Sequence, residues 1–354
     1  MTQRHPIRLG VILAALLIAI ALVSLGLGPA ASIGLGDVLH AAAAKCGLAE
    51  TMPGSVQVIA ELRLYRLFVS IGVGAALALS GALLQGVFRN QLASPSIIGV
   101  TSGASLGASL MILAISSSSS FFLVGNAASM GPLLVTLAAF IGAAVSTVIV
   151  TAFATTGGRI SVPTLLLVGI ALNAIVGGAI AAIQRFAVEE ADLMRALMTW
   201  TFGRLDDRAG YQVVTIWVGL AAAVMVIPRV ATELDLFAAG EDDAHTLGVD
   251  TSRVKWLSLG CAALCAALAV SVAGQIGFIG LIAPHVLRRL VGTSNRHVLW
   301  LSLLAGPVLL CGAELGQRLV FGHSPLPPGV IMSLIGGPFF LMLLMRNRSS
   351  VEGW

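Results

Sequence analysis

The sequence predicts an all-helical integral membrane protein with about ten transmembrane helices. Of its 354 residues, 57% are hydrophobic and only 10% are charged, and the mean hydropathy is +0.98. A soluble domain carries about a quarter charged residues, so this surface is not suited to water on all sides. The 40 glycines agree, because transmembrane helices use small residues to bring their backbones close together. The formal net charge of +4 fits membrane orientation better than nucleic-acid binding.

The predicted spans are the apolar stretches bounded by charged residues, proline or glycine. The first follows Arg4 and Arg8 and superficially resembles a signal peptide, but it is about 20 residues long and no cleavage site follows it. We therefore expect it to be retained as the first helix. The predicted spans are 9–29, 66–88, 96–115, 127–155, 162–186, 211–228, 254–273, 279–291, 298–320 and 328–346.

One predicted span, 279–291, is too short for a straight crossing at about 1.5 Å per residue. Gly277, Gly280 and Pro284 lie in or beside it, as is typical of a broken or re-entrant segment. Broken helices are tolerated in lipid only where protein or a cavity covers the exposed backbone. This segment therefore suggests a transport pathway.

The positions of lysine and arginine favour an orientation with both termini in the cytoplasm. This orientation places the majority of the 20 basic residues on the inner side, and it agrees with an even number of spans. It places segments 30–62 and 187–210 outside, in the periplasm, and segment 229–253 inside. We expect the whole chain, 1–354, to form a single transmembrane domain.

The inner segment 229–253 has the pattern of two short helices joined by a turn. Apolar residues such as Leu236 and Leu247 are interspersed with acidic ones, Gly240 permits a sharp turn, and Gly248 is a natural helix stop. Short helices on the inner face of a transporter suit docking into the groove of a partner. A solvated connector is the alternative, although the other predicted inner loops are short.

Four sequence blocks carry a resemblance to a known family. They are ELRLYRL (61–67), the block 74–108 with QGVFRNQLASPSIIGVTSGASLGA, LGVDTSRVKW (247–256), and VAGQIGFIGLIAPHVLRRLVG (272–292) continuing to 325–340. Through them the chain resembles the FecCD-type permease family of ABC importers, which take up iron–siderophore complexes, haem and cobalamin. The resemblance implies the type II ABC importer permease fold, with ten spans per subunit and two subunits around a central pathway.

The resemblance also implies a role for three arginines on the outer side. Outer arginines of such permeases pair with acidic residues of a substrate-binding protein, and the matching positions are Arg63, Arg66 and Arg318. A guanidinium group suits this role because it can bind a carboxylate through two hydrogen bonds. The alternatives are helix-end anchoring for the first two, and an intrahelical ion pair with Glu314 for Arg318. The family usually has proline where Tyr65 stands.

Two further groups of residues take their expected roles from the same resemblance. Segment 229–253 matches the coupling helices that dock on two ATP-hydrolysing subunits. The coupling positions carried over are Leu236, Gly240, Ala244, Leu247 and Gly248. The cytoplasmic gate of a cobalamin-type relative maps to the turn after the second span and to the start of the fifth. The corresponding residues here are Asn90, Leu92, Val162 and Pro163.

Several classes of activity lack their signature residues. The sequence has no GxxxxGK[ST] phosphate loop, so we expect no ATPase site in this chain and assign ATP–Mg to partner subunits. No Ser-His-Asp spacing, HExxH motif or Cys/His pattern indicates an enzyme or a metal site, and we expect no bound cofactor. Apart from Glu314, ionisable residues are almost missing inside the predicted spans. Their scarcity argues against the main alternative class, an ion-coupled secondary transporter.

We therefore expect the permease subunit of an ABC importer that moves an iron chelate, a ferric siderophore, across the inner membrane. Haem and cobalamin are the alternative cargoes. The expected partners are two ATPase subunits, a periplasmic substrate-binding protein, a second permease copy or a paralogue, and membrane lipid, with no nucleic acid.

Overall fold

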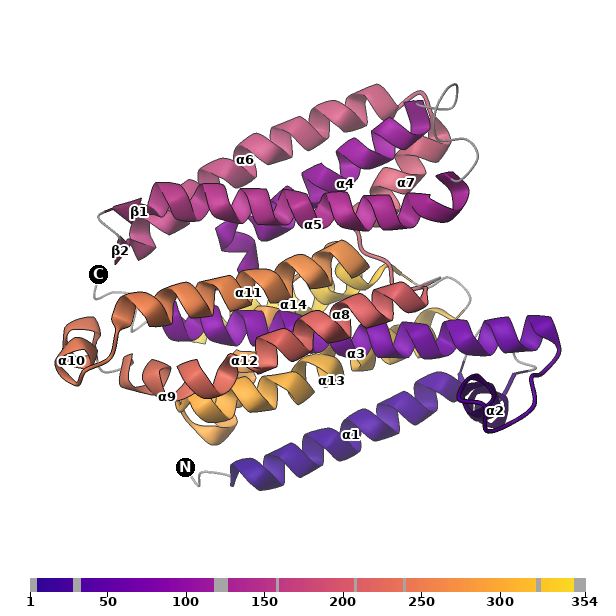
Figure 1. The fold of residues 1–354 in the computed structure, drawn as a ribbon, viewed down its shortest axis with the longest axis horizontal. Helices are drawn as coiled ribbons and strands as arrows, with labels where there is room; N and C mark the ends of the chain where they lie inside the picture. Colours follow the sequence, from indigo (N-terminus) through magenta and orange to yellow (C-terminus); the bar gives the residue numbers. More distant parts are fainter. Residues whose placement is uncertain are drawn as a thin grey trace.

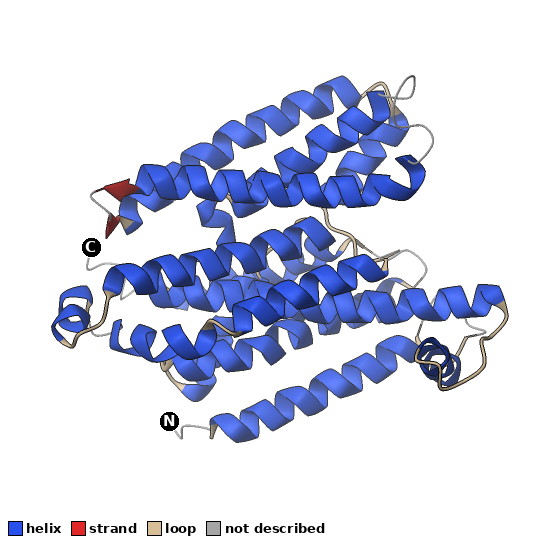
Figure 2. Cartoon of the chain, in the orientation of Figure 1, coloured by secondary structure: helices blue, strands red, loops and turns tan. Residues whose placement is uncertain are grey.

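The computed structural model describes residues 5–27, 33–117, 127–156, 159–206, 209–237, 240–322 and 326–346, and these ranges are almost entirely helical (Figure 2). Their only β-strand residues form a hairpin of β1 (Thr155–Thr156) and β2 (Arg159–Ile160). The predicted all-helical class is confirmed. The helices are α1 (Pro6–Gly26), α2 (Leu35–Lys45), α3 (Gly54–Phe88), the 3-10 turn η1 (Pro95–Ile98), α4 (Val100–Ser117), α5 (Ala127–Ala154), α6 (Val162–Ala187), α7 (Ala191–Thr201), α8 (Gly210–Val224), α9 (Ile227–Phe237), α10 (Glu241–Thr246), α11 (Thr251–Ala273), α12 (Ile279–Val291), α13 (Asn295–Phe321) and α14 (Pro328–Arg346).

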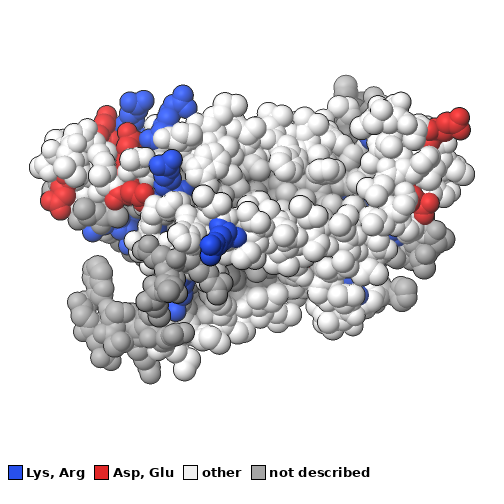
Figure 3. All heavy atoms as spheres, turned by 90° about the horizontal axis from the view of Figure 1, so that it is seen from below, with Lys and Arg blue, Asp and Glu red and all other residues white. Residues whose placement is uncertain are grey.

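The long apolar helices form a bundle that can span a membrane. Among the described residues, α1, α3, α5, α6, α11 and α13 are long and apolar enough to cross one. Helices α8 and α9 form a bent pair with 53° between them, and α4 and α14 are shorter apolar helices. Together with α12, these elements correspond to the ten predicted spans. On the face seen in Figure 3, charged residues gather toward the two ends, and a broad belt with hardly any charge separates them.

Helix α3 lies at the centre of the bundle, packed against α11 and α13 (Figure 1). Every residue from Gly72 to Phe88 is buried, which suits a helix surrounded by other helices. Helix α1 covers one side of this group, and α4, α5 and α6 form a layer on the other (Figure 1). Helices α1 and α6 leave most of their apolar side chains exposed or partly exposed, as expected for contact with lipid or another subunit.

The two ends of the bundle carry different elements (Figure 1). Helix α1 begins and α14 ends at the same end, where the hairpin, α9 and α10 also lie; we call this the α10 end. Helices α2 and α7 lie at the opposite end, the α2 end. This arrangement agrees with the predicted even number of spans, and it separates segment 229–253 from segments 30–62 and 187–210 as predicted.

Several helix boundaries differ from the predicted ones, and two of these differences are informative. The predicted span 211–228 is interrupted after Val224, and Pro228 is the second residue of α9. Proline lacks an N–H donor and is best accommodated in the first turn of a helix, which is where Pro228 lies in α9. Helix α3 begins at Gly54, well before the predicted start at 66, and it continues through Tyr65. A proline at that position would have interrupted its hydrogen bonds.

Close backbone contact holds the short helix α12 against α3. A Cβ atom on Gly81 would overlap the backbone of Gly280, so only glycine permits this approach. The side-chain amide of Gln85, one turn along α3, donates to the carbonyl oxygens of Gly280 and Leu281 at 3.3 and 3.4 Å. Helix α12 has the predicted boundaries, and the protein rather than lipid covers its N-terminal turn, as a broken span requires.

Candidate functional site

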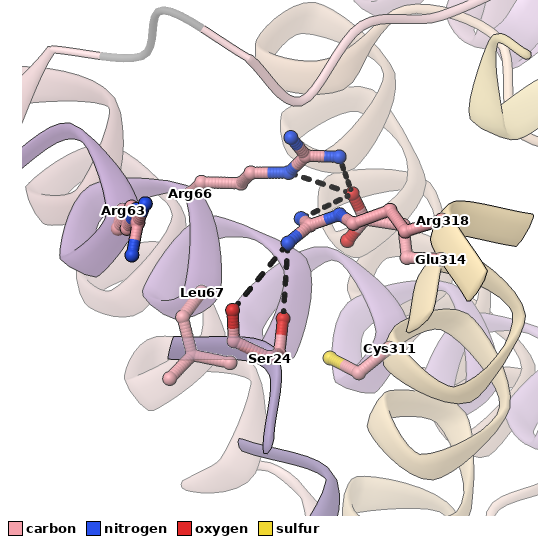
Figure 4. Close-up of a pocket in the computed structure, with 7 residues that line it drawn as sticks. All are labelled: Ser24, Arg63, Arg66, Leu67, Cys311, Glu314 and Arg318. Carbon is pink, nitrogen blue, oxygen red and sulfur yellow. Dashed lines mark hydrogen bonds and ion pairs between the residues drawn. The ribbon is translucent and has the colours of Figure 1, made fainter. Parts of the chain in front are cut away.

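The three predicted docking arginines lie near the α2 end, around a small pocket between α1, α3 and α13 (Figure 4). Residues four apart on a helix share a face, which places Glu314 and Arg318 of α13 side by side. Helix α3 brings Arg63 and Arg66 from the opposite wall. The pocket is lined by Ser24, Arg63, Arg66, Leu67, Cys311, Glu314 and Arg318.

The carboxylate of Glu314 is the centre of what we call the outer cluster: Arg66, Ser70, Asp206, Glu314 and Arg318. Its Oε1 accepts hydrogen bonds from Nε and Nη2 of Arg66 at 2.8 and 2.5 Å, and Nη2 of Arg318 lies 3.5 Å away (Figure 4). Its Oε2 accepts from the Ser70 hydroxyl at 2.8 Å. The side chain is only 5% exposed, so these donors replace the water that a buried charge would otherwise need.

A second carboxylate reaches Arg66 from the surface. Nη1 of Arg66 contacts Oδ1 of Asp206, which lies in the stretch between α7 and α8. The Asp206 side chain is 45% exposed, whereas that of Arg66 is 16% exposed. Arg66 therefore bridges one buried acid and one acid that water can reach.

The other two arginines are anchored near the C-terminal end of α1. Nη1 of Arg63 donates to the carbonyl oxygens of Leu25 and Ile33 at 3.1 and 2.9 Å. Nη1 of Arg318 lies 3.4 Å from the hydroxyl of Ser24. Carbonyl groups at a helix C-terminus carry partial negative charge and attract cations. The structure brings the three arginines together, with partners inside the chain; their docking role stays a prediction.

Next to the outer cluster, a surface network ties α2 to α3. The ammonium group of Lys45 lies 2.8 Å from a carboxylate oxygen of Glu61, contacts the Tyr65 hydroxyl and lies over the Tyr65 ring. The hydrogen bonds to Glu61 and Tyr65 raise the pKa of Lys45. Tyr65, at the position where the family usually has proline, thus has a structural role of its own.

The predicted coupling residues lie on α9, α10 and the turns beside them, at the α10 end. Gly240 and Gly248 have φ angles of +151° and +86°, which confirms the predicted turn and helix stop. Ala244 is buried, whereas Leu236 and Leu247 are 38% and 65% exposed. Two exposed leucines on one short segment at a charged end of the bundle fit the predicted docking surface.

Helix α10 is fastened to the bundle by an ion pair. A carboxylate oxygen of Glu241 lies 2.6 Å from Nζ of Lys255 in α11. The Lys255 side chain is 7% exposed, and its ammonium group also lies 5.7 Å from the centre of the Phe237 ring. Glu241 thus has a partner within the chain.

The four predicted gate residues lie in two turns at the α10 end. Arg89 ends α3 in a left-handed conformation with a φ of +51°, and Oδ1 of Asn90 then accepts a hydrogen bond from the backbone N–H of Leu92 at 2.9 Å. Val162 and Pro163 are the first two residues of α6. Both pairs stand at the turn and helix start where they were expected, and their gating role stays a prediction.

The chain matches a known family along nearly its whole length. The model of the FecCD transport family matches residues 16–346, a range that holds the outer cluster, the coupling segment and both gate turns. The chain belongs to the FecCD transport family. The predicted resemblance is therefore confirmed.

Relatives of this FecCD chain are permeases of several import systems. The cobalamin import permease BtuC of Halobacterium salinarum is 39% identical, over 88% of this chain and 78% of that protein. The hemin transport permease HmuU of Yersinia pestis is 34% identical, over 83% of this chain and 84% of that protein. The Fe(3+)-citrate import permease YfmE of Bacillus subtilis is 32% identical, over 97% of this chain and 96% of that protein.

A solved structure has the same fold. A metal-chelate type ABC transporter in an inward-facing conformation superposes with a TM-score of 0.77 at 25% identity, covering 96% of this chain and 99% of the other. The chain is thus the permease of an ABC importer of the metal-chelate, cobalamin or haem type, a class in which separate subunits hydrolyse ATP.

Sequence reasoning on the FecCD chain missed two residues of the outer cluster, Ser70 and Asp206. The pair of Glu314 with Arg318 could be read from their spacing, but Arg66 and Glu314 are 248 positions apart. Asp206 gave no signal, because it stands among other charged residues of a predicted outer segment. Within the described residues, no group of three or more His, Cys, Asp or Glu side chains is placed to hold a metal ion.

Proposed function

We propose that this permease imports an iron chelate, with a ferric siderophore as its cargo. One observation favours an ATP-driven importer over an ion-coupled carrier: the buried charged side chains of this chain are paired. Among the described residues, Lys255 and Glu314 are the only buried Lys, Arg, Asp or Glu side chains, and both are paired. An ion-coupled carrier needs ionisable groups that bind and release ions along its pathway.

Two relatives bear on the cargo. The ferric citrate permease of Bacillus subtilis aligns over 97% of this chain, which supports an iron chelate. The 39% identity to the Halobacterium salinarum permease makes cobalamin the second candidate. A largely apolar pathway would hold little affinity for either cargo, so selectivity would lie in the binding protein.

We place the permease in the inner membrane, with the α10 end in the cytoplasm and the α2 end in the periplasm. It pairs with a second permease subunit and carries two ATPase subunits, which bind ATP–Mg. When the ATPases close on ATP, they displace segment 229–253, and the two gate turns reopen the pathway by a rigid-body change. A periplasmic binding protein delivers the cargo at the α2 end.

Transport into liposomes tests this function. Vesicles that contain the permease and its ATPase are supplied with binding protein loaded with ferric citrate, a ferric siderophore, haem or cobalamin. We expect ATP-dependent accumulation of a ferric chelate. Accumulation of cobalamin alone would select the second candidate, and accumulation of none of the four would reject both. Failure of any ATPase to assemble with the permease would contradict the proposed pairing with two ATPase subunits.

The geometry of Arg66 suggests how docking proceeds. Glu314 holds the guanidinium group from inside, and Asp206 occupies its outer side. Because Asp206 is the exposed partner, an incoming carboxylate of the binding protein would replace Asp206 and leave the pair with Glu314 intact. Arg63→Glu with Arg66→Glu should weaken docking, and the difference should shrink as salt rises, because exposed charges are screened.

Asp206→Asn gives the sharper docking test. We expect the binding protein to bind this variant about two- to fivefold more tightly, the size of an exposed ion pair that no longer competes. Affinity would be measured with the permease in nanodiscs at low salt. The matched control is Glu189→Gln, which removes one exposed negative charge at the same end of the molecule. Equal affinity of the two variants would show that Asp206 does not compete for Arg66.

A further inference from the structure

A second polar cluster joins the coupling segment to α12 and α13 at the α10 end. We call it the inner junction; its residues are Leu234, Asp235, Arg288, Ser294 and Asn295. They come from α9, from the last turn of α12 and from the start of α13. The sequence patterns did not connect α9 with α13, because the contacts of Leu234 and Asp235 with Ser294 and Asn295 join residues about 60 positions apart.

Asp235 caps a helix to which it does not belong. Its Oδ2 accepts a hydrogen bond from the Ser294 hydroxyl at 2.9 Å, and its Oδ1 accepts from the backbone N–H of Asn295, the first residue of α13. The first N–H groups of a helix lack partners inside the helix, and a carboxylate satisfies both their hydrogen bonds and the positive end of the helix dipole. Ser294 makes no side-chain cap of its own. The start of α13 therefore depends on α9.

Asn295 completes the junction from the other side. Its side-chain amide donates to the carbonyl oxygen of Leu234 at 2.9 Å, and its Oδ1 accepts from Nη2 of Arg288 at 2.8 Å. The residue is 3% exposed, so these contacts are protected from water. A Cβ atom on Gly86 of α3 would lie 3.2 Å from Oδ1 of Asn295, so the backbone of α3 packs closely against this amide. One buried amide thus holds α9 and α12 to the same point.

Helix α12 connects the inner junction with the centre of the bundle. Arg288 stands in its last turn, and Gly280 in its first turn presses on Gly81 of α3. A displacement of α9 would therefore move α12 and the start of α13 with it, and so reach the helix contacts deep in the bundle.

We propose that Asp235 and Asn295 are positioning residues that transmit the movement of the coupling segment to α12 and α13. This inference rests on the proposed docking of segment 229–253 on the ATPase. Asp235 and Asn295 touch neither cargo nor nucleotide in this role. They make α9, α12 and the start of α13 move as one body when the ATPase closes.

Hydrogen exchange measured on the permease–ATPase complex in nanodiscs tests the proposal without cargo. In the unmodified complex, ATP with vanadate should change exchange both in residues 229–253 and in residues 279–300. In Asp235→Ala and Asn295→Ala, the exchange change in residues 229–253 should persist, and that in residues 279–300 should disappear. In the liposome assay, cargo moved per ATP hydrolysed should fall about tenfold, a size typical of coupling between sites. Both substitutions break the same junction. The double variant should therefore lose no more transport per ATP hydrolysed than the more affected single variant.

Two variants separate transmission from simple loss of structure. Asp235→Asn keeps an oxygen for the N–H of Asn295, and its amide can donate to Ser294, so it should retain most of the coupling. Asp37→Ala removes a carboxylate cap within one helix at the α2 end, the hydrogen bond from the N–H of Gly34 at 2.8 Å, and should leave both measurements unchanged. If Asp235→Ala does not fold, Ser294→Ala removes one contact from a half-buried side chain and should reduce transmission in the same direction.

The outcomes distinguish this inference from the proposed function. If hydrogen exchange in residues 279–300 still changes in Asp235→Ala and Asn295→Ala, the transmission role is overturned. The proposed docking of segment 229–253 would then stand. No exchange change in residues 229–253 of the unmodified complex would instead contradict the proposed coupling role itself.

Discussion

Leu247→Glu is expected to separate the permease from its ATPase. Leu247 is 65% exposed beside α10, and an apolar side chain that fills a partner's groove contributes about 2 kcal/mol or more when truncated. The loss corresponds to roughly a thirtyfold rise in Kd. A glutamate adds the cost of burying a charge. The measurement is co-purification with the ATPase, followed by titration of the ATPase onto permease in nanodiscs, and transport should fall in parallel.

Two control variants define what the Leu247 result means. Leu48→Glu makes the same change at an 82% exposed leucine of the α2 end, where no ATPase is expected, and it should leave assembly intact. Leu247→Met keeps an apolar side chain of similar volume and should retain most of the affinity. Undiminished ATPase binding by Leu247→Glu would mean that the segment is a solvated connector.

Glu314→Ala is expected to cause the largest loss of stability among single changes in the outer cluster. It leaves the guanidinium groups of Arg66 and Arg318 close together without their shared carboxylate, and breaking a buried ion pair in this way costs about 3–5 kcal/mol. Thermal unfolding of the purified permease in detergent should show a clear fall in Tm. Glu314→Gln keeps an acceptor oxygen without the charge, so its Tm should lie between those of Glu314→Ala and the unmodified protein.

The matched control for Glu314 is Gln317→Ala on the same helix. Gln317 is equally buried, but it is neutral, and among the described residues its side chain makes one hydrogen bond, from the N–H of Leu326 at 2.8 Å. Its removal should cost about 1–3 kcal/mol. Replacing Arg66, Glu314 and Arg318 together with leucine should recover most of the loss, because apolar residues can substitute for a buried ion cluster. A Tm of Glu314→Ala equal to that of the unmodified protein would contradict this account.

Local sequence patterns predicted the helices well because lipid imposes a local requirement. A backbone in hydrocarbon must satisfy its own hydrogen bonds, so a long apolar stretch becomes a helix whatever packs beside it. The boundaries of α12 followed from its glycines, and Gly240 and Gly248 lie in the turns where they were expected. The break at Pro228 was also readable, but the apolar character of 211–228 obscured it.

The sites were only partly predictable. The resemblance picked out Arg63, Arg66 and Arg318, and the structure brings them to one pocket. It did not reveal that Glu314 and Asp206 hold Arg66 from two sides, nor that Asp235 caps α13. No spacing rule links such residues, because their distance along the chain is unrelated to their distance in space.

The sequence alone determined that this protein is a bundle of membrane helices, that it belongs among importer permeases, and which segments lie at opposite ends of the bundle. These properties depend on apolar length, glycine and proline positions and family motifs, all of which lie along the chain. Only the tertiary structure decided which charges are paired. Helix packing selects the partner of each buried ion, since the low dielectric of the bundle makes an unpaired charge too costly to keep.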